Sequence, residues 1–473
     1  MPTPIIVWHR RDLRLHDNTA LALAVERSFQ VIPVFILDPA ILARPDTAPA
    51  RVQYLLEALT DLSQGYERIG GRLILRQGDP VRILPQLGRE VGATQAIWNQ
   101  DVEPYAQARD QRVQQALESE GITTQACQDM LLHGPGEILT QAGDVYSVFT
   151  PFWRNWSSQA KADPYPVPQR IKTPDLDTLV IPTLQDLDIS CDQELSAAGE
   201  SVALQDLDRF CLEGLIFGYD QQRNLPAEEG TSRLSPHLRW GTLGIRQVWQ
   251  TTCDAEAEVR SDEAESSLRT WRQELGWREF YKHALAAWPH LESSPYRSEF
   301  QEFEWDNNQD HFASWCEGRT GYPMVDAAMR QLNQTGWMHN RCRMIVASFL
   351  TKDLLIDWRW GERYFMQKLV DGDLAANNGG WQWSASVGTD PKPLRIFNPA
   401  TQAAKFDPEG EYIRRYVPEL AGLETRALLE VGGSKAGQWA AQERSQCNYP
   451  LPIVDHKLQQ QVFKQRYQAC RGS

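Results

Sequence analysis

A short segment, residues 371–383, carries side chains whose types and spacing suit chemistry. Two acids one residue apart, Asp371 and Asp373, are followed by Asn377 and by two indoles, Trp381 and Trp383. Carboxylates at this spacing suit a ribityl chain, a sugar or a metal, and indoles can stack on a base or carry an electron. A calcium loop needs further oxygen ligands and a bidentate glutamate, and neither follows. Each residue alone fits a capped helix with core tryptophans, but the combination favours a chemical site without a metal.

Two other segments place mixed side chains on one helix face. Positions i, i+3, i+4 and i+7 of the segment 271–287 hold an acid, an indole, a guanidinium and a phenol: Glu274, Trp277, Arg278 and Tyr281. The same spacing recurs later with an amide, a cation and a thioether: Asn340, Arg343 and Met344. A core position would explain an indole or a thioether, but not the charged and amide groups. Both faces therefore predict recognition of a ligand.

Length and composition limit the classes of protein that can carry these faces. The chain has 473 residues, enough for two or three domains, and 42% of them are hydrophobic, as in globular proteins. No amino-terminal signal and no apolar run of about 20 residues is present, which predicts a cytoplasmic protein. The eight cysteines form no Cys-x-x-Cys pair, so neither a disulfide framework nor a structural metal is indicated.

The charge distribution is uneven. The net charge of −14 argues against a protein that coats nucleic acid non-specifically. Residues 330–395 nevertheless contain nine Lys/Arg and six Asp/Glu, so this part is net +3. Surface charge is often merely solvated, but the 17 tryptophans of the chain add the aromatic faces that a flipped or single-stranded base requires. A local phosphate-facing groove is therefore expected.

The elements that position these residues change along the chain. In residues 1–127, short apolar runs such as 31–37 alternate with amphipathic stretches such as 51–62, which predicts an α/β, doubly wound, Rossmann-like parallel sheet. Neither Gly-x-Gly-x-x-Gly nor Gly-x4-Gly-Lys-Ser/Thr occurs. Residues 128–200 are rich in Pro, Asp, Gln and Thr and predict a long linker. Residues 201–473 predict an all-helical domain, with helices such as 206–217 and 342–355.

Four long motifs resemble a known family. They are residues 8–18, 320–330, 336–344 and 371–383, and they resemble the photolyase/cryptochrome family, most nearly its class I cyclobutane pyrimidine dimer photolyases of the cyanobacterial deazaflavin type. The resemblance covers essentially the whole chain. It implies an amino-terminal antenna domain, a helical domain that holds FAD in a U shape, and light-driven repair of UV-damaged DNA.

The resemblance also assigns residues to FAD. Those expected to contact the cofactor or lie against it are Tyr219, Thr231, Ser232, Leu234, Ser235, Trp271, Glu274, Arg278, Asn340, Arg343, Asp371, Asp373 and Asn377. Hydroxyls and backbone amides at 231–235 suit a pyrophosphate, and Asn377 near the flavin N5 can follow its protonation state. Plant cryptochromes carry Asp at the position of Asn377, so the asparagine favours repair over signalling.

The implied substrate pocket holds a dimer that leaves the duplex, which costs least at a distorted site. Glu274 would hydrogen-bond the thymine carbonyl edge, with Asn340, Arg343 and Met344 on one wall and Trp277 and Trp383 on the other. Tyr281 is also expected to bind the lesion. (6-4) photolyases place histidines around residues 340–344 as acid and base, whereas Asn340 and Met344 here offer no such proton donor, which favours cyclobutane dimers. Phosphate contacts that position the strand would come from Arg223, Arg341, Gln402 and Lys405.

The implied reaction is transfer of an electron from excited, fully reduced FAD to the dimer, splitting of the ring, and return of the electron, with the cofactor carrying the chemistry. Catalytic roles fall to Glu274, Asn340, Met344 and Asn377. Photoreduction of oxidised flavin would use a chain of Trp381, Trp358 and Trp305, each of which could equally be a packing residue.

The antenna chromophore is a further expectation. Folate-binding members carry an Asn-Glu pair where this chain has Tyr105 and Ala106. The favoured chromophore is therefore 8-hydroxy-5-deazaflavin, with folate or FMN as alternatives. Its binding residues would be Arg11, Phe35, Leu37, Asp38, Arg51, Tyr54, Asp101 and Glu103.

Three rival functions remain. A signalling cryptochrome usually adds a long carboxy-terminal extension, and this chain ends soon after the pattern does. A DASH cryptochrome, acting mainly on single-stranded DNA, is disfavoured by Glu274 and Met344. A flavin oxidoreductase lacks a nicotinamide fingerprint here. The family implies a monomer.

Overall fold

The structure is a computed structural model that describes residues 3–389 and 394–472. Its amino-terminal part is a parallel five-stranded sheet in the order β3-β2-β1-β4-β5. The strands are β1 (Ile5–His9), β2 (Val31–Leu37), β3 (Ile74–Gln77), β4 (Gln95–Asn99) and β5 (Thr123–Cys127). The order reverses between β1 and β4, so the sheet is doubly wound, and ligands of such sheets bind at the carboxyl ends of the strands near this point.

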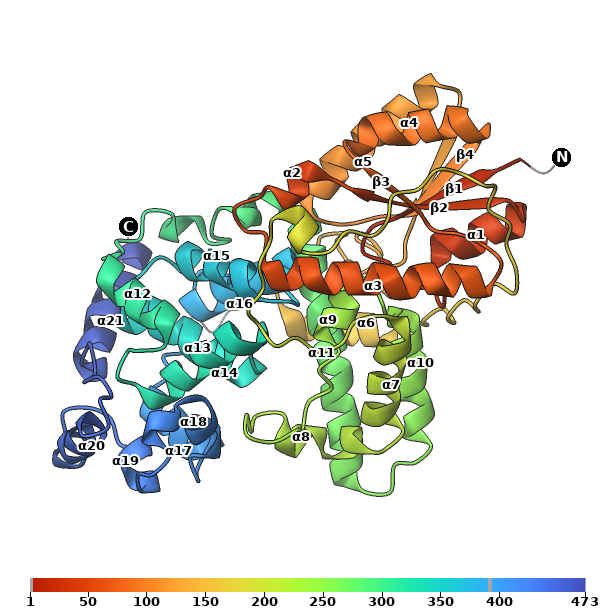
Figure 1. Cartoon of the computed structure of the whole chain (residues 1–473). Coiled ribbons are helices and arrows are strands. Elements are labelled where there is room, and N and C mark those ends of the chain that lie inside the picture. Colours follow the sequence, from red (N-terminus) through yellow and green to blue (C-terminus); the bar gives the residue numbers. More distant parts are fainter. Residues whose placement is uncertain (1–2, 390–393, 473) are drawn as a thin grey trace.

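Helices cover both faces of the sheet (Figure 1). Along β1, Ile5 and Val7 join one hydrophobic cluster, and Ile6 and Trp8 join another on the opposite face. The first cluster includes α1 (Thr19–Arg27) and α3 (Pro49–Arg68), and the second includes α4 (Pro80–Val91) and α5 (Pro104–Ser119). Strands buried on both faces read as continuous apolar runs, which is why this part was recognisable from sequence.

The remainder of the described chain is mostly helical, which confirms the predicted fold class. The connection after β5 contains α6 (Phe149–Ser158), which packs against α11. The other helices are α2 (Pro39–Leu42), α7 (Glu200–Cys211), α8 (Tyr219–Gln222), α9 (Ser235–Trp240), α10 (Ile245–Glu256), α11 (Asp262–Ala287), α12 (Gln309–Glu317), α13 (Pro323–Thr335), α14 (Asn340–Ser348), α15 (Trp358–Lys368), α16 (Leu374–Ala385), α17 (Pro399–Phe406), α18 (Glu411–Tyr416), α19 (Thr425–Leu429), α20 (Lys435–Ser445) and α21 (His456–Gly472). None of the helices described is long and apolar enough to cross a membrane.

Two predicted helices have the wrong bounds. The helix expected over 206–217 is α7, which begins at Glu200 and ends at Cys211, because Gly214 takes a positive φ of 92° that interrupts it. The helix expected over 342–355 is two elements. α14 ends at Ser348, and a π-helical turn, Phe349–Asp353, follows it. A buried apolar run has no periodicity that would reveal such a change.

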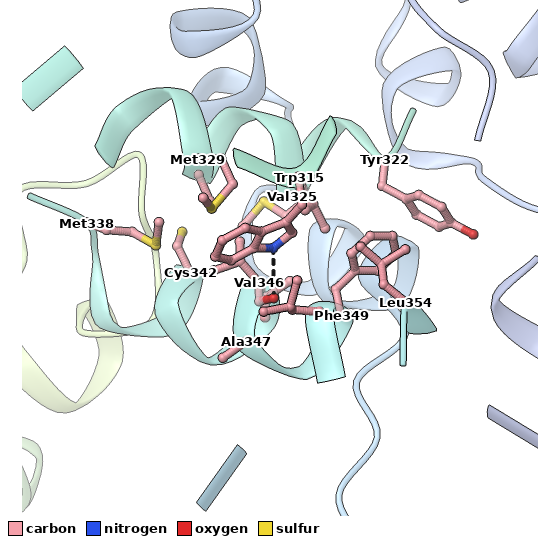
Figure 2. Close-up of a cluster of buried hydrophobic side chains, with 14 of the residues drawn as sticks. Trp315, Tyr322, Val325, Met329, Met338, Cys342, Val346, Ala347, Phe349 and Leu354 are labelled. Carbon is pink, nitrogen blue, oxygen red and sulfur yellow. Dashed lines mark hydrogen bonds between the residues drawn. The ribbon is translucent and has the colours of Figure 1, made fainter. Parts of the chain in front are cut away.

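The core beneath α14 is built around Trp315. Figure 2 shows this indole among Met329, Cys342 and Val346, and its Nε1 donates a hydrogen bond to the Val346 carbonyl over 3.1 Å. The ring of Trp315 also meets that of Trp381 at 6.1 Å between centroids. The core therefore fixes α14 and α16 relative to each other.

Candidate active site

One cavity of about 580 Å³ brings together the helix faces expected from sequence. Its lining includes four side chains of α11, three of α14 and five from 371–383: Glu274, Trp277, Arg278, Tyr281, Asn340, Arg343, Met344, Asp371, Asp373, Asn377, Trp381 and Trp383. Arg223 lines it as well. The volume lies within the range of cofactor and substrate pockets.

Asp371 offers an acceptor that the protein leaves unused. Its Oδ2 accepts a hydrogen bond from Arg343 Nη2 over 2.8 Å, whereas its Oδ1 is buried without a partner among the described residues. A buried carboxylate oxygen without a donor is costly, so the site suits a ligand that brings an N–H or O–H group. FAD has such donors on its ring imide and on its ribityl hydroxyls, and the cavity residues therefore fit this cofactor.

Asp373 has a different environment from Asp371. Its Oδ1 caps α16 by accepting from the Ala376 amide over 3.3 Å, and its Oδ2 pairs with Lys282 over 2.7 Å and with Arg11. Burial opposes its ionisation, but the charges of Lys282 and Arg11 outweigh burial and hold the pKa of Asp373 well below its usual range. Asp373 is therefore an anion that orients α16.

Lys282 was not predicted as a site residue. It lies four residues after Arg278 on α11, so the same helical spacing could have found it. The side chain is 1% exposed, and burial lowers its pKa to about 8.

Glu274 forms an ion pair with Arg223, with 2.8 Å between Oε1 and Nη1. Burial raises the pKa of Glu274, and the charge of Arg223 counteracts this. Arg223 was expected to contact phosphate, but in the structure it lies against the acid of the cavity. Across the cavity, Asn340 Nδ2 lies 3.9 Å from Met344 Sδ.

Two further lining residues were missed by sequence reasoning. Phe149, from α6, stacks on Trp277 with ring centroids 3.6 Å apart and planes 10° apart. The Arg395 guanidinium lies 5.0 Å from the ring centroid of Trp383. No local pattern pointed to Phe149, because it comes from the predicted linker. Arg395 was counted in the basic stretch but was not singled out.

Asn377 is held by an acid of the neighbouring helix α15. Its Nδ2 donates to the carbonyl of Glu362 over 3.0 Å and to the carboxylate Oε1 over 3.1 Å. Among the described residues its Oδ1 accepts no hydrogen bond, and because Asn377 lines the cavity this oxygen can accept from a donor there. Burial raises the pKa of Glu362 to about 7.

This pKa leads to a pH-dependent prediction for Glu362→Gln. A carboxyl whose pKa is raised on folding loses stabilisation as pH rises, so ionised Glu362 costs stability between its unfolded pKa and neutrality and above. In apoprotein, the stability of the variant relative to the wild type should rise by about 2–3 kcal/mol between pH 5 and pH 8. Denaturant unfolding at both pH values measures this difference. An unchanged difference would show that Glu362 does not titrate there.

Six residues expected against FAD do not line the cavity. Tyr219 and Trp271 are buried with ring centroids 5.6 Å apart, and Trp271 Nε1 donates to Thr252. Thr231 lines a separate cavity of about 240 Å³. The other three residues follow Thr231 closely in the chain. Ser232 and Leu234 are buried, and Ser235 accepts a hydrogen bond from Trp337 Nε1. Their contact with FAD stays a prediction.

The structure places the three tryptophans of the expected electron chain in the helical part. Trp381 and Trp358 are buried, and Trp305 is partly buried against Phe303, at 4.3 Å between ring centroids. Trp381 packs directly on Gly361 of α15, the helix that begins with Trp358. Its closest indole contact among the described ring pairs is Trp315, which was not predicted. The electron-transfer role stays a prediction.

Arg341 and Lys405 lie together on one aromatic ring. The cationic groups of both lie over Phe406, at 4.5 Å and 5.1 Å from its centroid, and Arg341 donates to Asn224 over 2.7 Å. Gln402 lies on the same helix as Lys405, and its Oε1 is buried without a partner in the described chain. The pair of cations provides a local positive surface in an acidic protein.

For Arg341→Ala we expect weaker DNA binding with a smaller salt dependence, because one phosphate contact contributes a slope of about −0.9 in log K against log salt. Flavin content should not change. Binding to dimer-containing DNA at several salt concentrations measures the slope. Arg89→Ala, which removes an exposed arginine paired with Glu120 on the α/β domain, is the control. An unchanged slope in Arg341→Ala would refute the phosphate contact.

A second cavity, of about 180 Å³, lies at the carboxyl edge of the sheet and is called here the antenna cavity. Seven of the eight expected antenna residues line it: Arg11, Phe35, Leu37, Asp38, Arg51, Asp101 and Glu103. Tyr54, the eighth, does not line the antenna cavity, and its contact with the chromophore stays a prediction. Tyr54 lines the cavity of about 240 Å³ that also contains Thr231, and its hydroxyl hydrogen-bonds His237 Nδ1 at 2.6 Å. The reason is that α3 presents successive side chains to different faces.

Comparisons with known proteins agree with this arrangement. Residues 5–170 match the model of the family described as DNA photolyase, and residues 271–469 match the FAD binding domain of DNA photolyase. A deoxyribodipyrimidine photo-lyase of Synechococcus sp. is 51% identical, over 100% of this chain and 98% of its own. The Escherichia coli photo-lyase is 40% identical over 99% of each chain.

Solved structures share the fold. A class III photolyase from Agrobacterium tumefaciens superposes with a TM-score of 0.90 at 40% identity, covering 100% of this chain and 98% of its own. An archaeal photolyase from Sulfolobus tokodaii, solved with two FAD molecules, gives 0.84 at 32% identity, covering 99% of this chain and all of its own. The chain therefore belongs to the photolyase/cryptochrome family.

Proposed function

We propose that this chain is a deoxyribodipyrimidine photo-lyase, an enzyme that uses light to split cyclobutane pyrimidine dimers in UV-damaged DNA. The observation that carries the proposal is the single cavity in which Glu274, Asn340 and Met344 meet the acids of the 371–383 segment. The full-length similarity to enzymes of that name supports it. When bound, reduced FAD supplies the electron that the reaction requires.

The protein's own side chains bind and orient the cofactor and the flipped dimer. Asp371 and Arg343 present polar groups to the cofactor, and Asn377, held by Glu362, offers an amide oxygen to a ring N–H. Glu274 faces the same space and can accept hydrogen bonds from the bases of a flipped dimer, because its carboxylate is acceptor-only when ionised. The stacked pair of Phe149 and Trp277 supplies a flat apolar wall for those bases.

The test is light-dependent repair of one defined cyclobutane thymine dimer in duplex DNA. A dark control and a (6-4) lesion are run in parallel. Repair of the cyclobutane dimer alone, and only in light, is expected, since no histidine lies between residues 340 and 344 to serve a (6-4) lesion. No repair with reduced flavin bound would move the protein to the cryptochromes.

The antenna chromophore that we propose is 8-hydroxy-5-deazaflavin. The antenna cavity offers donors for acidic or carbonyl oxygens. Arg239 Nη1 and Trp240 Nε1 are buried there without partners among the described residues. Tyr105 and Ala106 also line it, in place of the Asn-Glu pair of folate-binding members. Extraction of folate or FMN from native protein would overturn this choice. A cytoplasmic monomer stays a prediction.

A further inference from the structure

Three arginines connect the antenna cavity to the wall of the cavity of about 580 Å³, which is called the flavin cavity because the proposed function places FAD in it. Arg11, Arg51 and Arg239 all line the antenna cavity, and each bonds to the segment 366–373. Arg11 pairs with the Asp373 carboxylate. The other two bond to backbone: Arg51 Nη1 donates to the carbonyls of Met366 and Leu369, and Arg239 Nε donates to that of Gly372 over 2.6 Å.

The segment 366–373 is the partition between the two cavities. Met366 lines the antenna cavity, whereas Leu369, Asp371 and Asp373 line the flavin cavity. The arginines approach it closely, since a Cβ on Gly372 would lie only 2.5 Å from Arg51 Nη1. The segment leads directly into α16, which carries Asn377, Trp381 and Trp383, so a change in how it is held must reach the flavin site.

Two of these arginines form no ion pair within 4 Å in the described chain, although carboxylates act on both from farther away. Arg11 has Asp101 and Glu103 in addition to Asp373. Arg51 and Arg239, in contrast, have no carboxylate within 4 Å in the described chain, although the other charged lining groups include Asp38, Asp46 and Glu292. Burial, followed by the charge of Arg239, lowers the pKa of Arg51 to about 9. Arg239 also has its Nη1 unpaired. Two buried cations that share no close anion repel each other, and this repulsion opposes the burial of both.

We propose that an anionic or carbonyl oxygen of the antenna chromophore binds Arg51 and Arg239, and that these arginines pass its binding on to the segment 366–373, so that the antenna and FAD bind cooperatively. The proposal rests on the proposed function, because it takes the two cavities as chromophore sites. An oxygen of the chromophore beside Arg51 and Arg239 reduces the repulsion between these two cations. The hydrogen bonds that they donate to the carbonyls of the segment 366–373 are then stabilised. Arg51, from α3 of the α/β part, and Arg239, from α9 of the helical part, are thus positioning residues for the flavin site.

The experiment titrates apoprotein with FAD, with and without saturating 8-hydroxy-5-deazariboflavin, and follows flavin fluorescence and the thermal midpoint. The Kd for FAD should fall about tenfold when the deazaflavin is present, and the Kd for the deazaflavin should fall by the same factor when FAD is present, because binding linkage is reciprocal. An unchanged Kd for FAD with the deazaflavin bound would overturn the proposal.

Substitutions of Arg239 and Arg51 test whether these arginines carry the coupling between deazaflavin binding and FAD binding. Arg239→Gln, with Arg51→Lys as a second variant should the first not fold, should bind FAD more weakly alone and lose the tenfold effect. Arg44→Gln is the matched control: it lines the same cavity but pairs with Asp46 and makes no described bond to the partition. It should keep the coupling. Retention of the coupling in Arg239→Gln and Arg51→Lys would refute their role.

The experiments distinguish failure of the cooperative-binding proposal from failure of the proposed photo-lyase function. If the deazaflavin does not bind, the proposal is overturned, while dimer repair by the FAD-loaded protein still tests the photo-lyase function independently. Coupling produced by FMN and not by the deazaflavin would overturn the proposal as it stands for the deazaflavin.

Discussion

Replacing Asp373 by Asn should destabilise the protein by about 3–5 kcal/mol, because it leaves the buried cations Arg11 and Lys282 without their shared anion. Their side chains are 10% and 1% exposed. Asparagine caps helices as well as aspartate, so the cap of α16 is retained and the substitution tests charge alone. A loss of this size is a large part of the stability of an ordinary domain.

Denaturant unfolding of apoprotein measures the effect, and flavin retention should fall with it. Asp357→Asn is the control, since Asp357 also caps a helix, α15, and pairs with Arg359 at a more exposed site. It should cost about 0–1 kcal/mol. The pKa of Asp373 is depressed on folding, so its contribution is present at neutral pH and is lost as pH falls from about 4 toward the depressed value. Equal losses in both variants would contradict a special role for Asp373.

Glu274→Ala should reduce dimer repair per absorbed photon far more than it reduces flavin content. A hydrogen bond to a charged group contributes about 1.5–3 kcal/mol, so affinity for the dimer should fall roughly 10- to 150-fold. Arg223 would lose its partner, but its side chain is 20% exposed and water can replace the carboxylate. The fold should therefore survive.

The measurements are repair yield, flavin content and affinity for DNA with and without one dimer. Glu274→Gln keeps a carbonyl acceptor and should restore part of the affinity. Glu263→Ala, in the exposed first turn of the same helix, is the control and should behave as wild type. Parallel loss of flavin and repair in Glu274→Ala would make this residue structural.

Local patterns accounted for much of the site. The face of α11 from Glu274 to Tyr281 was predictable because i, i+3, i+4 and i+7 positions share a face in any α-helix. The five-stranded domain was predictable for most of its strands because burial on both faces selects apolar runs. β5 was not predicted, because it is an edge strand in which only Cys127 is buried and the other residues, such as Thr123 and Thr124, are exposed or half-buried. Periodicity gives no warning of it.

Contacts between segments that are distant in the sequence could not be predicted from local sequence patterns. Phe149 stacks on Trp277 from 128 residues earlier in the chain, and it lies where composition indicated only a linker. Tyr54 was assigned to the antenna by resemblance, yet α3 turns it toward His237. The bond from Asn377 to Glu362 joins two helices whose packing no single segment specifies.

The sequence by itself determined the family, the two fold classes and the helix faces of α11 and α14 that line the flavin cavity, since those depend on motifs and on the periods of helix and strand. Tertiary structure alone decided how charges are paired: Arg223 with Glu274, and Arg11 and Lys282 with Asp373. It also decided that one segment, 366–373, separates two cavities. The physical reason is that an ion pair depends on which side chains the whole fold brings within a few ångströms, and Arg11 and Asp373 are 362 residues apart.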